Sequence, residues 1–433
     1  MKWFCVLVAC LLAWAGDAVR AAERPNVVMI ISDDQAWNDY SFMGHPHVKT
    51  PRIDRLARES LTFRRGYVPS SLCCPSLASI ITGLYPHQHK VTSNDPPLPP
   101  GVPRRGFQRR PEFAAGREVM NQHLEAVPTL PRMLGERGYR SFQSGKWWQG
   151  HYRRGGFTHG MTQGERHGDA GLDIGRKTME PMFDFMDESA AADEPFFVWY
   201  APFMPHSPHT PPERLLEKYV DQAPSIHVAR YWAMIEWFDE TVGQLLDHLE
   251  AKSLAADTIV IYVADNGWIQ SVDNPRFAHR SKQSQYDGGV RTPIMVRWTG
   301  TVEPQMSSEL AVSVDLAPTV LVAAGLKPTP EMQGINLLDE SAVKARQAIY
   351  GECFTHDAND LNDPAANLRW RWMVEGDWKL IVPDPQNEPD AEVELYNLAD
   401  DEHEQHNLAG DEPKRVSRMR EMLDDWWNPA GGA

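Results

Sequence analysis

The stretch Asn26–Ser32 reads NVVMIIS and is followed directly by two aspartates, Asp33 and Asp34. Two later runs have the same texture: Phe196–Ala201 reads FFVWYA and Thr258–Ala264 reads TIVIYVA. Continuous apolar, β-branched and aromatic residues over this length are typical of strands that are buried on both faces. The sequence therefore predicts three central strands of a sheet that is covered on both sides.

The segments between these strands carry apolar residues at three- and four-residue spacing, which predicts amphipathic helices. These helices are expected over Arg52–Glu59, Leu130–Arg137, Thr178–Ser189 and His227–Leu249. Strands that alternate with helices favour an α/β fold, here a large mixed, mostly parallel sheet flanked by helices. In contrast, Asp95–Arg117 is dense in Pro, Gly and Arg and is interpreted as a long surface loop.

The pattern of apolar residues changes near residue 345. Short aromatic strands are predicted over Arg371–Val374 and Trp378–Ile381, and a closing helix near Lys414–Trp426. This pattern predicts a smaller C-terminal α+β subdomain, with an antiparallel sheet plus a helix, over residues 345–433. The main domain is then expected to span residues 22–344.

The first residues have the pattern of a secretory signal peptide. Lys2 precedes an apolar run, Trp3–Ala15, and Val19-Arg20-Ala21 places small residues at the −3 and −1 positions of a cleavage site. The run is shorter than the ~20 residues of a membrane helix. We therefore predict a signal peptide over residues 1–21 and a secreted or periplasmic protein that has no membrane association after cleavage.

The charge and the cysteine content limit which functional classes this sequence fits. The 43 Lys+Arg and 59 Asp+Glu residues give a formal net charge of −16, which disfavours binding to nucleic acid or to an anionic membrane. An anionic substrate therefore needs a local cationic pocket or a metal ion. Only Cys73, Cys74 and Cys353 remain after signal cleavage, too few for a disulfide framework in a chain of 433 residues.

Oxygen-bearing side chains follow two of the predicted central strands. Asp33 and Asp34 come after the first, and Asp265 and Asn266 after the third. Ligands bind beyond the carboxyl ends of strands in open α/β sheets, and oxygen ligands suit Ca²⁺ or, less well, Mg²⁺. Either pair alone is more often a cap or turn. Both pairs together favour a metal site.

The segment from Cys73 to Gly83 resembles the signature of the formylglycine-dependent (type I) sulfatases of the alkaline phosphatase superfamily. That signature is Cys-x-Pro-x-Arg followed at a fixed distance by Thr-Gly, and Cys73, Pro75, Thr82 and Gly83 match it. Further segments resemble the same family in the same order over nearly the whole mature chain. They are Asp33-Asp34, Thr50–Ala57, Ser144–Trp147, Pro205–His209, Asp265–Gly267, Lys282 with Tyr286–Gly289, and Glu394–Leu398.

The resemblance implies a function and a role for each matching residue. A maturation enzyme would oxidise Cys73 to formylglycine, whose hydrate supplies the nucleophile, and the geminal diol then lets the covalent sulfate ester be expelled. Lys146 and Lys282 would neutralise the sulfate oxygens, while His206 transfers a proton near the leaving group and His209 contacts substrate. The implied ligands of a Ca²⁺ ion are Asp33, Asp34, Asp265 and Asn266. Residues 22–344 would then form the sulfatase catalytic domain.

Two positions depart from the family pattern. Leu77 stands where the signature has Arg, and Trp148 stands where family members often have His. Because the other motif residues remain, we predict an active sulfatase. The alternatives are a catalytically silent sulfatase-like protein that binds anionic glycans, and a phosphate or phosphonate monoester hydrolase on the same fold.

Arginine clusters near the Lys146 segment give an indication of the substrate class. Arginine binds sulfates and carboxylates of a glycan well, although such clusters are equally compatible with a solvated loop. The sequence favours a sulfated carbohydrate as substrate, with a small aryl or alkyl sulfate second. The arginines are Arg104, Arg105, Arg109, Arg110 and Arg117 before Lys146, and Arg153 and Arg154 after it.

Overall fold

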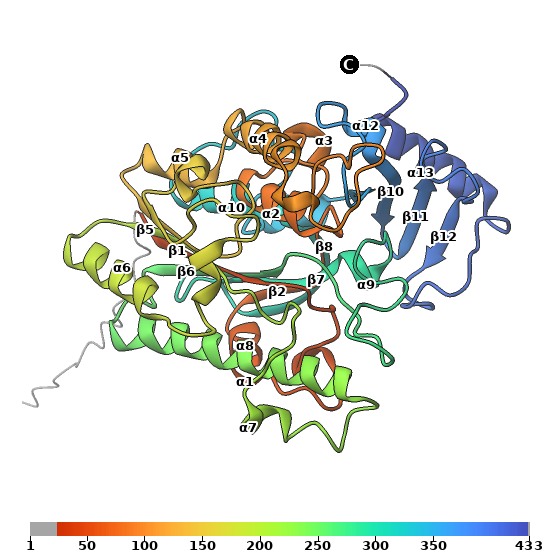
Figure 1. The fold of residues 1–433 in the computed structure, drawn as a ribbon. Helices are drawn as coiled ribbons and strands as arrows, with labels where there is room; N and C mark the ends of the chain where they lie inside the picture. The colour runs from red at the N-terminus through yellow and green to blue at the C-terminus, as the bar shows by residue number, and fades with distance from the viewer. Residues whose placement is uncertain (1–23, 432–433) are drawn as a thin grey trace, which may run out of the picture.

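The computed structural model of the chain describes residues 24–431 (Figure 1). The signal peptide predicted over residues 1–21 lies outside the described residues. Two sheets organise the described part of the chain, one of eight strands and one of four.

The larger sheet contains the three central strands that the sequence predicts. Its order is β4-β3-β5-β1-β6-β7-β2-β8, and β1 lies between β5 and β6, parallel to both. Only β7 runs antiparallel to its neighbours, so the sheet is mixed but mostly parallel. The strands are β1 (Asn26–Ser32), β2 (Leu61–Tyr67), β3 (Arg140–Gly145), β4 (His159–Gly160), β5 (Phe196–Ala201), β6 (Thr258–Ala264), β7 (Arg291–Arg297) and β8 (Gln305–Val312).

Helices cover both faces of this sheet, as Figure 1 shows. Alternate residues of β1 point to opposite faces: Val27 and Met29 pack with α2, α4, α5 and α10, whereas Val28 and Ile30 pack with α1, α6 and α8. No helix within residues 24–431 combines the length and the apolar composition needed to cross a membrane. The helices are α1 (Pro51–Arg58), α2 (Cys73–Thr82), α3 (Pro86–His89), α4 (Pro111–Glu125), α5 (Leu130–Gly135), α6 (Glu180–Ala191), α7 (Glu213–Leu216), α8 (Ile226–Ala251), α9 (Asp287–Val290), α10 (Leu316–Ala323), α11 (Glu340–Ala345), α12 (Pro364–Asn367) and α13 (Pro413–Trp426).

The smaller sheet is antiparallel and lies at the C-terminal end of the chain. It has the order β12-β11-β10-β9, and α13 packs against it through Met419 and Leu423. The predicted fold class, a large mixed sheet with a smaller antiparallel sheet plus a helix, is confirmed. The strands of the second sheet are β9 (Ala348–Phe354), β10 (Leu368–Glu375), β11 (Trp378–Pro383) and β12 (Glu394–Asn397).

The predicted loop over Asp95–Arg117 is wrong in its last part, because α4 begins at Pro111. Proline is well tolerated in the first turn of a helix, where its missing N–H would have no intrahelical partner. Phe113, Met120 and Leu124 then form a buried face of α4. The density of proline in this segment marks the start of a helix as well as a loop.

Candidate active site

The predicted site residues lie at the carboxyl ends of neighbouring strands. Asp33 follows β1 and Asp265 follows β6, and the register pairs the last residues of these strands, Ser32 with Ala264. Lys146 follows β3, and His206 lies in the loop after β5, where Asp33 N–H donates to the Met204 carbonyl (3.0 Å). The parallel sheet therefore brings together residues that are far apart in the sequence.

Asp34 has a backbone conformation that aims it at its neighbours. Its φ is 66°, in the left-handed region that non-glycine residues seldom adopt. In this conformation its N–H donates to Asp265 Oδ1 (3.0 Å), and its Oδ1 accepts from Asn266 Nδ2 (2.7 Å). These bonds lock the two pairs of predicted metal ligands into one group.

Each of the four predicted metal ligands has one side-chain oxygen without a hydrogen bond among the described residues, and two of these oxygens have only longer contacts, Asp34 Oδ2 with His206 Nε2 (3.4 Å) and Asp265 Oδ2 with Lys146 Nζ (3.6 Å). All four side chains are buried, and these oxygens accept no hydrogen bond from any residue in the range 24–431. Unpaired buried oxygens are costly, so they indicate a missing partner. A hard divalent cation such as Ca²⁺ fits this donor set. The four oxygens are Asp33 Oδ2, Asp34 Oδ2, Asp265 Oδ2 and Asn266 Oδ1.

Lys146 follows a glycine at which the backbone passes very close to the end of β5. Gly145 has φ +78°, and a Cβ there would lie 1.9 Å from the Ala201 carbonyl oxygen, so this position requires glycine. Lys146 Nζ lies 2.5 Å from Asp33 Oδ1 and 3.6 Å from Asp265 Oδ2. Burial alone would lower the pKa of Lys146, but the surrounding carboxylates, Asp33 above all, raise it. Lys146 is therefore a fixed buried cation.

Lys282 links the carboxylate group to Cys73. Its Nζ lies 2.5 Å from Asp34 Oδ1 and 3.0 Å from Cys73 Sγ. Burial opposes the charge of Lys282, but the carboxylate of Asp34 raises the pKa of the ammonium above its ordinary value. A second cation is thus held directly beside the sulfur.

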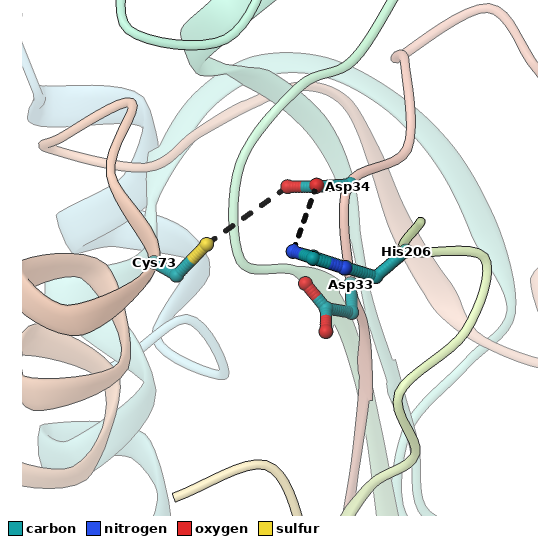
Figure 2. Close-up of side chains that lie close together, drawn as sticks. All are labelled: Asp33, Asp34, Cys73 and His206. Atoms are coloured by element: carbon teal, nitrogen blue, oxygen red, sulfur yellow. Dashed lines mark hydrogen bonds and ion pairs between the residues drawn. The ribbon is translucent and has the colours of Figure 1, made fainter. Parts of the chain in front are cut away.

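Cys73 is the first residue of α2 and faces the carboxylates (Figure 2). Its Sγ lies 3.9 Å from Asp34 Oδ1, and burial raises the pKa of the thiol. Ligand atoms of Cys73, Asp33, Asp34 and His206 all lie within 4.8 Å of one another. Cys74 contacts a different group, since its Sγ accepts from Gln149 Nε2 (3.2 Å). The predicted choice of Cys73 over Cys74 agrees with this geometry.

His206 faces the same group, as Figure 2 shows, whereas His209 does not belong to this group of ligand atoms. His206 Nδ1 donates to the Ser207 carbonyl (2.5 Å), and Nε2 lies 3.4 Å from Asp34 Oδ2. Burial, followed by the charges of the two lysines, lowers the pKa of His206. His209 packs against the rings of Tyr231 and Trp268, with centroids 5.3 and 5.9 Å apart, so its contact with substrate stays a prediction.

The two positions that depart from the family pattern have different surroundings. Leu77 is buried in the apolar core cluster. Trp148 packs on the same cluster, but the Arg166 guanidinium lies over its ring, 4.6 Å from the centroid. Arg65 does not take the place of the missing motif arginine, because its Nη1 bonds Asp377 Oδ1 (3.0 Å) in the loop between β10 and β11. The nearest cation to Cys73 is therefore Lys282.

A pocket of about 650 Å³ opens above Cys73, Lys282 and His206. Several of its lining residues escape sequence reasoning, because they lie in irregular loops where no periodic pattern or strand end marks them. Many of them are cationic or aromatic, which suits an anionic substrate with an extended organic part. They include Asn94, Trp148, Arg166, His167, Trp268, Arg276 and His356.

Comparison with known families gives two matches to this chain. The family model named Sulfatase matches residues 25–326. A second model, described as N-sulphoglucosamine sulphohydrolase, C-terminal, matches residues 277–426. Together the two models span both sheets of the structure.

Individual relatives and a solved structure agree with these matches. Arylsulfatase A from Homo sapiens is 29% identical over 375 residues, which cover 75% of this chain and 68% of that protein. N-acetylgalactosamine-6-sulfatase from Mus musculus is 26% identical over 410 residues, covering 82% and 74%. The solved structure of BT4656 in complex with its substrate D-glucosamine-2-N,6-O-disulfate has a TM-score of 0.69 at 18% identity, covering 94% of this chain and 98% of that one.

Proposed function

Because the chain belongs to the sulfatase family of the alkaline phosphatase superfamily, we propose that it hydrolyses a sulfate ester with a formylglycine derived from Cys73 and a Ca²⁺ ion. The observation that carries this function is the set of four buried oxygens near Cys73 that accept no hydrogen bond from the described residues. Buried oxygens are ordinarily hydrogen-bonded, so four such oxygens in one group favour a bound cation. A metal centre that binds substrate would use them as ligands.

Asp33, Asp34, Asp265 and Asn266 would hold the Ca²⁺ ion. Three carboxylates face the two ammonium groups of Lys146 and Lys282, which leaves a formal charge of −1 in the buried site. A divalent cation turns this charge to +1, which matches the single negative charge of a sulfate monoester. The ion would supply positive charge to the sulfate oxygens as the bond to sulfur breaks.

The protein side chains take the roles that the family resemblance implies. An aldehyde at Cys73 would supply, as its hydrate, the attacking hydroxyl. Lys282, which already lies 3.0 Å from Cys73 Sγ, orients this group, and Lys146 balances charge on the sulfate. His206 presents Nε2 to the same space and would act in proton transfer near the leaving-group oxygen. His209 would contact the substrate.

A sulfated carbohydrate is the proposed substrate class. The cationic and aromatic lining of the 650 Å³ pocket suits a sugar that bears anionic groups, and the names of N-acetylgalactosamine-6-sulfatase and of the BT4656 complex refer to sulfated amino sugars. Oxidation of the Cys73 thiol to an aldehyde needs a formylglycine-generating maturation enzyme and its oxidant. The proposal also includes a signal peptide over residues 1–21, secretion or periplasmic export, a catalytic domain over 22–344 and a C-terminal subdomain over 345–433.

Mass spectrometry of the protein from its natural host tests this function. Trypsin releases one peptide, Gly66–Lys90, that contains both Cys73 and Cys74. We expect fragmentation to locate an aldehyde at position 73 and an intact thiol at position 74. The same preparation should release inorganic sulfate from a panel of sulfated saccharides only when Ca²⁺ is present. A thiol at position 73 in protein that binds the saccharides would instead establish a non-catalytic binding protein.

A further inference from the structure

A second pocket of about 940 Å³ adjoins the pocket above Cys73. The two pockets share Trp148 and Arg166 as lining residues, so these side chains form a common wall. The second pocket is otherwise lined by residues of α4 and of the loops that precede α4 and follow β3. Three arginines from the predicted clusters, Arg109, Arg117 and Arg154, lie in this lining.

The lining of the second pocket holds four arginines and two glutamates, Glu118 and Glu165, in a chain that is acidic overall. Arg117 is buried, with 8% of its surface exposed, and it donates to the carbonyls of Asn94 (3.0 Å) and Trp148. No carboxylate within residues 24–431 forms an ion pair with Arg117 or with the exposed Arg109. Arg154, by contrast, is neutralised by Glu118 (2.6 Å) and Glu125 (2.7 Å). A buried cation without a counterion favours a bound anion.

Two residues that line the second pocket carry unpaired polar atoms. Trp148 and Asn121 are more than nine-tenths buried, and Trp148 Nε1 and Asn121 Oδ1 have no hydrogen-bond partner among the described residues. One is a donor and the other an acceptor, so a side-chain rotation that brings them to the pocket surface would let them bond the hydroxyl and anionic groups of a sugar.

The wall between the pockets is held rigidly. Arg166 makes a two-bond ion pair with Asp95, with Nε and Nη2 each 2.7 Å from a carboxylate oxygen. Its guanidinium lies over the Trp148 ring, 4.6 Å from the centroid. Trp148, the residue that departs from the family pattern, therefore supports a cation at the junction of the two pockets.

From these observations we infer that the second pocket is a subsite for a sulfate or carboxylate group on the sugar next to the one whose sulfate ester is cleaved. This inference rests on the proposed sulfatase function. Arg117 and Arg109 provide the charge, Asn121 and Trp148 contact the sugar, and Arg166 separates the two anionic groups. The enzyme then acts on a sulfated oligosaccharide in preference to an isolated sulfated sugar or a small aryl sulfate.

Binding to the Cys73→Ala protein with Ca²⁺ tests the subsite without turnover. The probes are hexasaccharides of chondroitin 6-sulfate, heparan sulfate and κ-carrageenan, with 4-nitrophenyl sulfate as the small ligand. We expect at least one hexasaccharide to bind more tightly than the aryl sulfate. Adding Arg109→Glu should lower the ratio of hexasaccharide to aryl sulfate affinity about tenfold, the scale of one lost charge-assisted contact. Asn121→Leu should lower the ratio less, because it removes one neutral hydrogen bond.

Arg153→Glu is the matched control, since Arg153 is an exposed arginine near the same segment that does not line either pocket. An equal loss of affinity in Arg109→Glu and Arg153→Glu would reflect general charge attraction and overturn the subsite. Aryl sulfate binding without tight hexasaccharide binding would also overturn the subsite but leave the sulfatase function standing. If neither kind of probe binds, the proposed function fails, and the subsite fails with it.

Discussion

Two buried clusters of charged side chains in this protein look alike in composition but differ in how their oxygens are paired. In the site beside Cys73, three carboxylates meet Lys146 and Lys282, and each carboxylate keeps one oxygen without a hydrogen bond. In the second cluster, Lys379 of β11 lies 2.8 Å from both Asp287 Oδ1 and Glu404 Oε1. The other oxygens of this cluster accept from Tyr67 (3.2 Å) and from the Asp287 N–H (2.6 Å).

This difference distinguishes a ligand-binding site from a cluster that only holds parts of the structure together. The Lys379 cluster connects the second sheet to α9 and to the loop after β12, and each of its four carboxylate oxygens lies within 3.2 Å of a donor. In the Cys73 cluster Asp34 Oδ2 and Asp265 Oδ2 have only longer contacts, at 3.4 and 3.6 Å, and Asp33 Oδ2 accepts no hydrogen bond from the described residues, which is the pattern that a cation site would leave. Composition alone would assign the same role to both, so the pairing of individual oxygens decides between them.

The largest expected effect is the loss of turnover in Cys73→Ala. The alanine cannot be oxidised to an aldehyde, so no nucleophile forms and sulfate release should fall to background. The melting temperature should stay close to that of the wild type, because the buried Cβ remains. Cys74→Ala is the matched control and should retain turnover. Full activity in Cys73→Ala would rule out the proposed nucleophile.

The second prediction removes the cation of the Lys379 cluster. Lys379→Met leaves Glu404 buried without a cation and Asp287 with only the longer contact to Arg291 Nη1 (3.5 Å), which should cost about 3–5 kcal/mol of unfolding free energy in urea denaturation. Lys344→Met removes a cation from an exposed ion pair with Glu340 and should change stability by less than about 0.5 kcal/mol. Equal stabilities for the two variants would contradict the structural role of the Lys379 cluster.

The third prediction concerns Ca²⁺ and needs no activity assay. At a free concentration about 100 times its Kd, an ion that binds only the folded protein should add about 2.7 kcal/mol of stability, seen as a higher melting temperature. Asp265→Asn removes one ligand charge and should weaken this shift. Asp273→Asn, at an exposed position in a nearby loop, should leave the shift intact. A shift of the same size in Asp265→Asn would place the ion elsewhere.

The sequence predicts the Cys73 cluster better than the Lys379 cluster for a physical reason. Asp33 and Asp265 follow apolar strands, and the carboxyl ends of parallel strands meet at one edge, so a local pattern implies a long-range contact. Lys379 lies within an otherwise apolar strand, and its partners come from a loop and a four-residue helix. Nothing in the sequence near Lys379 indicates that these three groups meet.

The lining of the pockets was only partly visible in the sequence. The arginine clusters supplied Arg109, Arg117 and Arg154, but Arg166 and Asn94 lie in segments with neither a repeat nor a strand end to locate them. The helix α4 shows the same limit, because its proline-rich start is also typical of a loop. Motif spacing thus predicted which residues gather around Cys73, while their surroundings required the folded chain.

The smallest expected effect comes from restoring the missing arginine at position 77. Leu77 lies one helical turn after Cys73 on α2, and side chains on a helix lean toward its N-terminus, so an arginine there would reach toward the nucleophile. One charge-assisted hydrogen bond is worth about 1.5–3 kcal/mol, but Lys282 already occupies the side of Cys73 that faces Asp34. We therefore expect Leu77→Arg to leave kcat/KM unchanged or raise it by up to about tenfold. Because Leu77 is buried in the core, the melting temperature should fall. The measurement is kcat/KM divided by the fraction of formylglycine at position 73, with Leu77→Met as the uncharged control of similar volume. A lower normalised kcat/KM in Leu77→Arg than in Leu77→Met would show that the apolar packing at this position is itself required for catalysis.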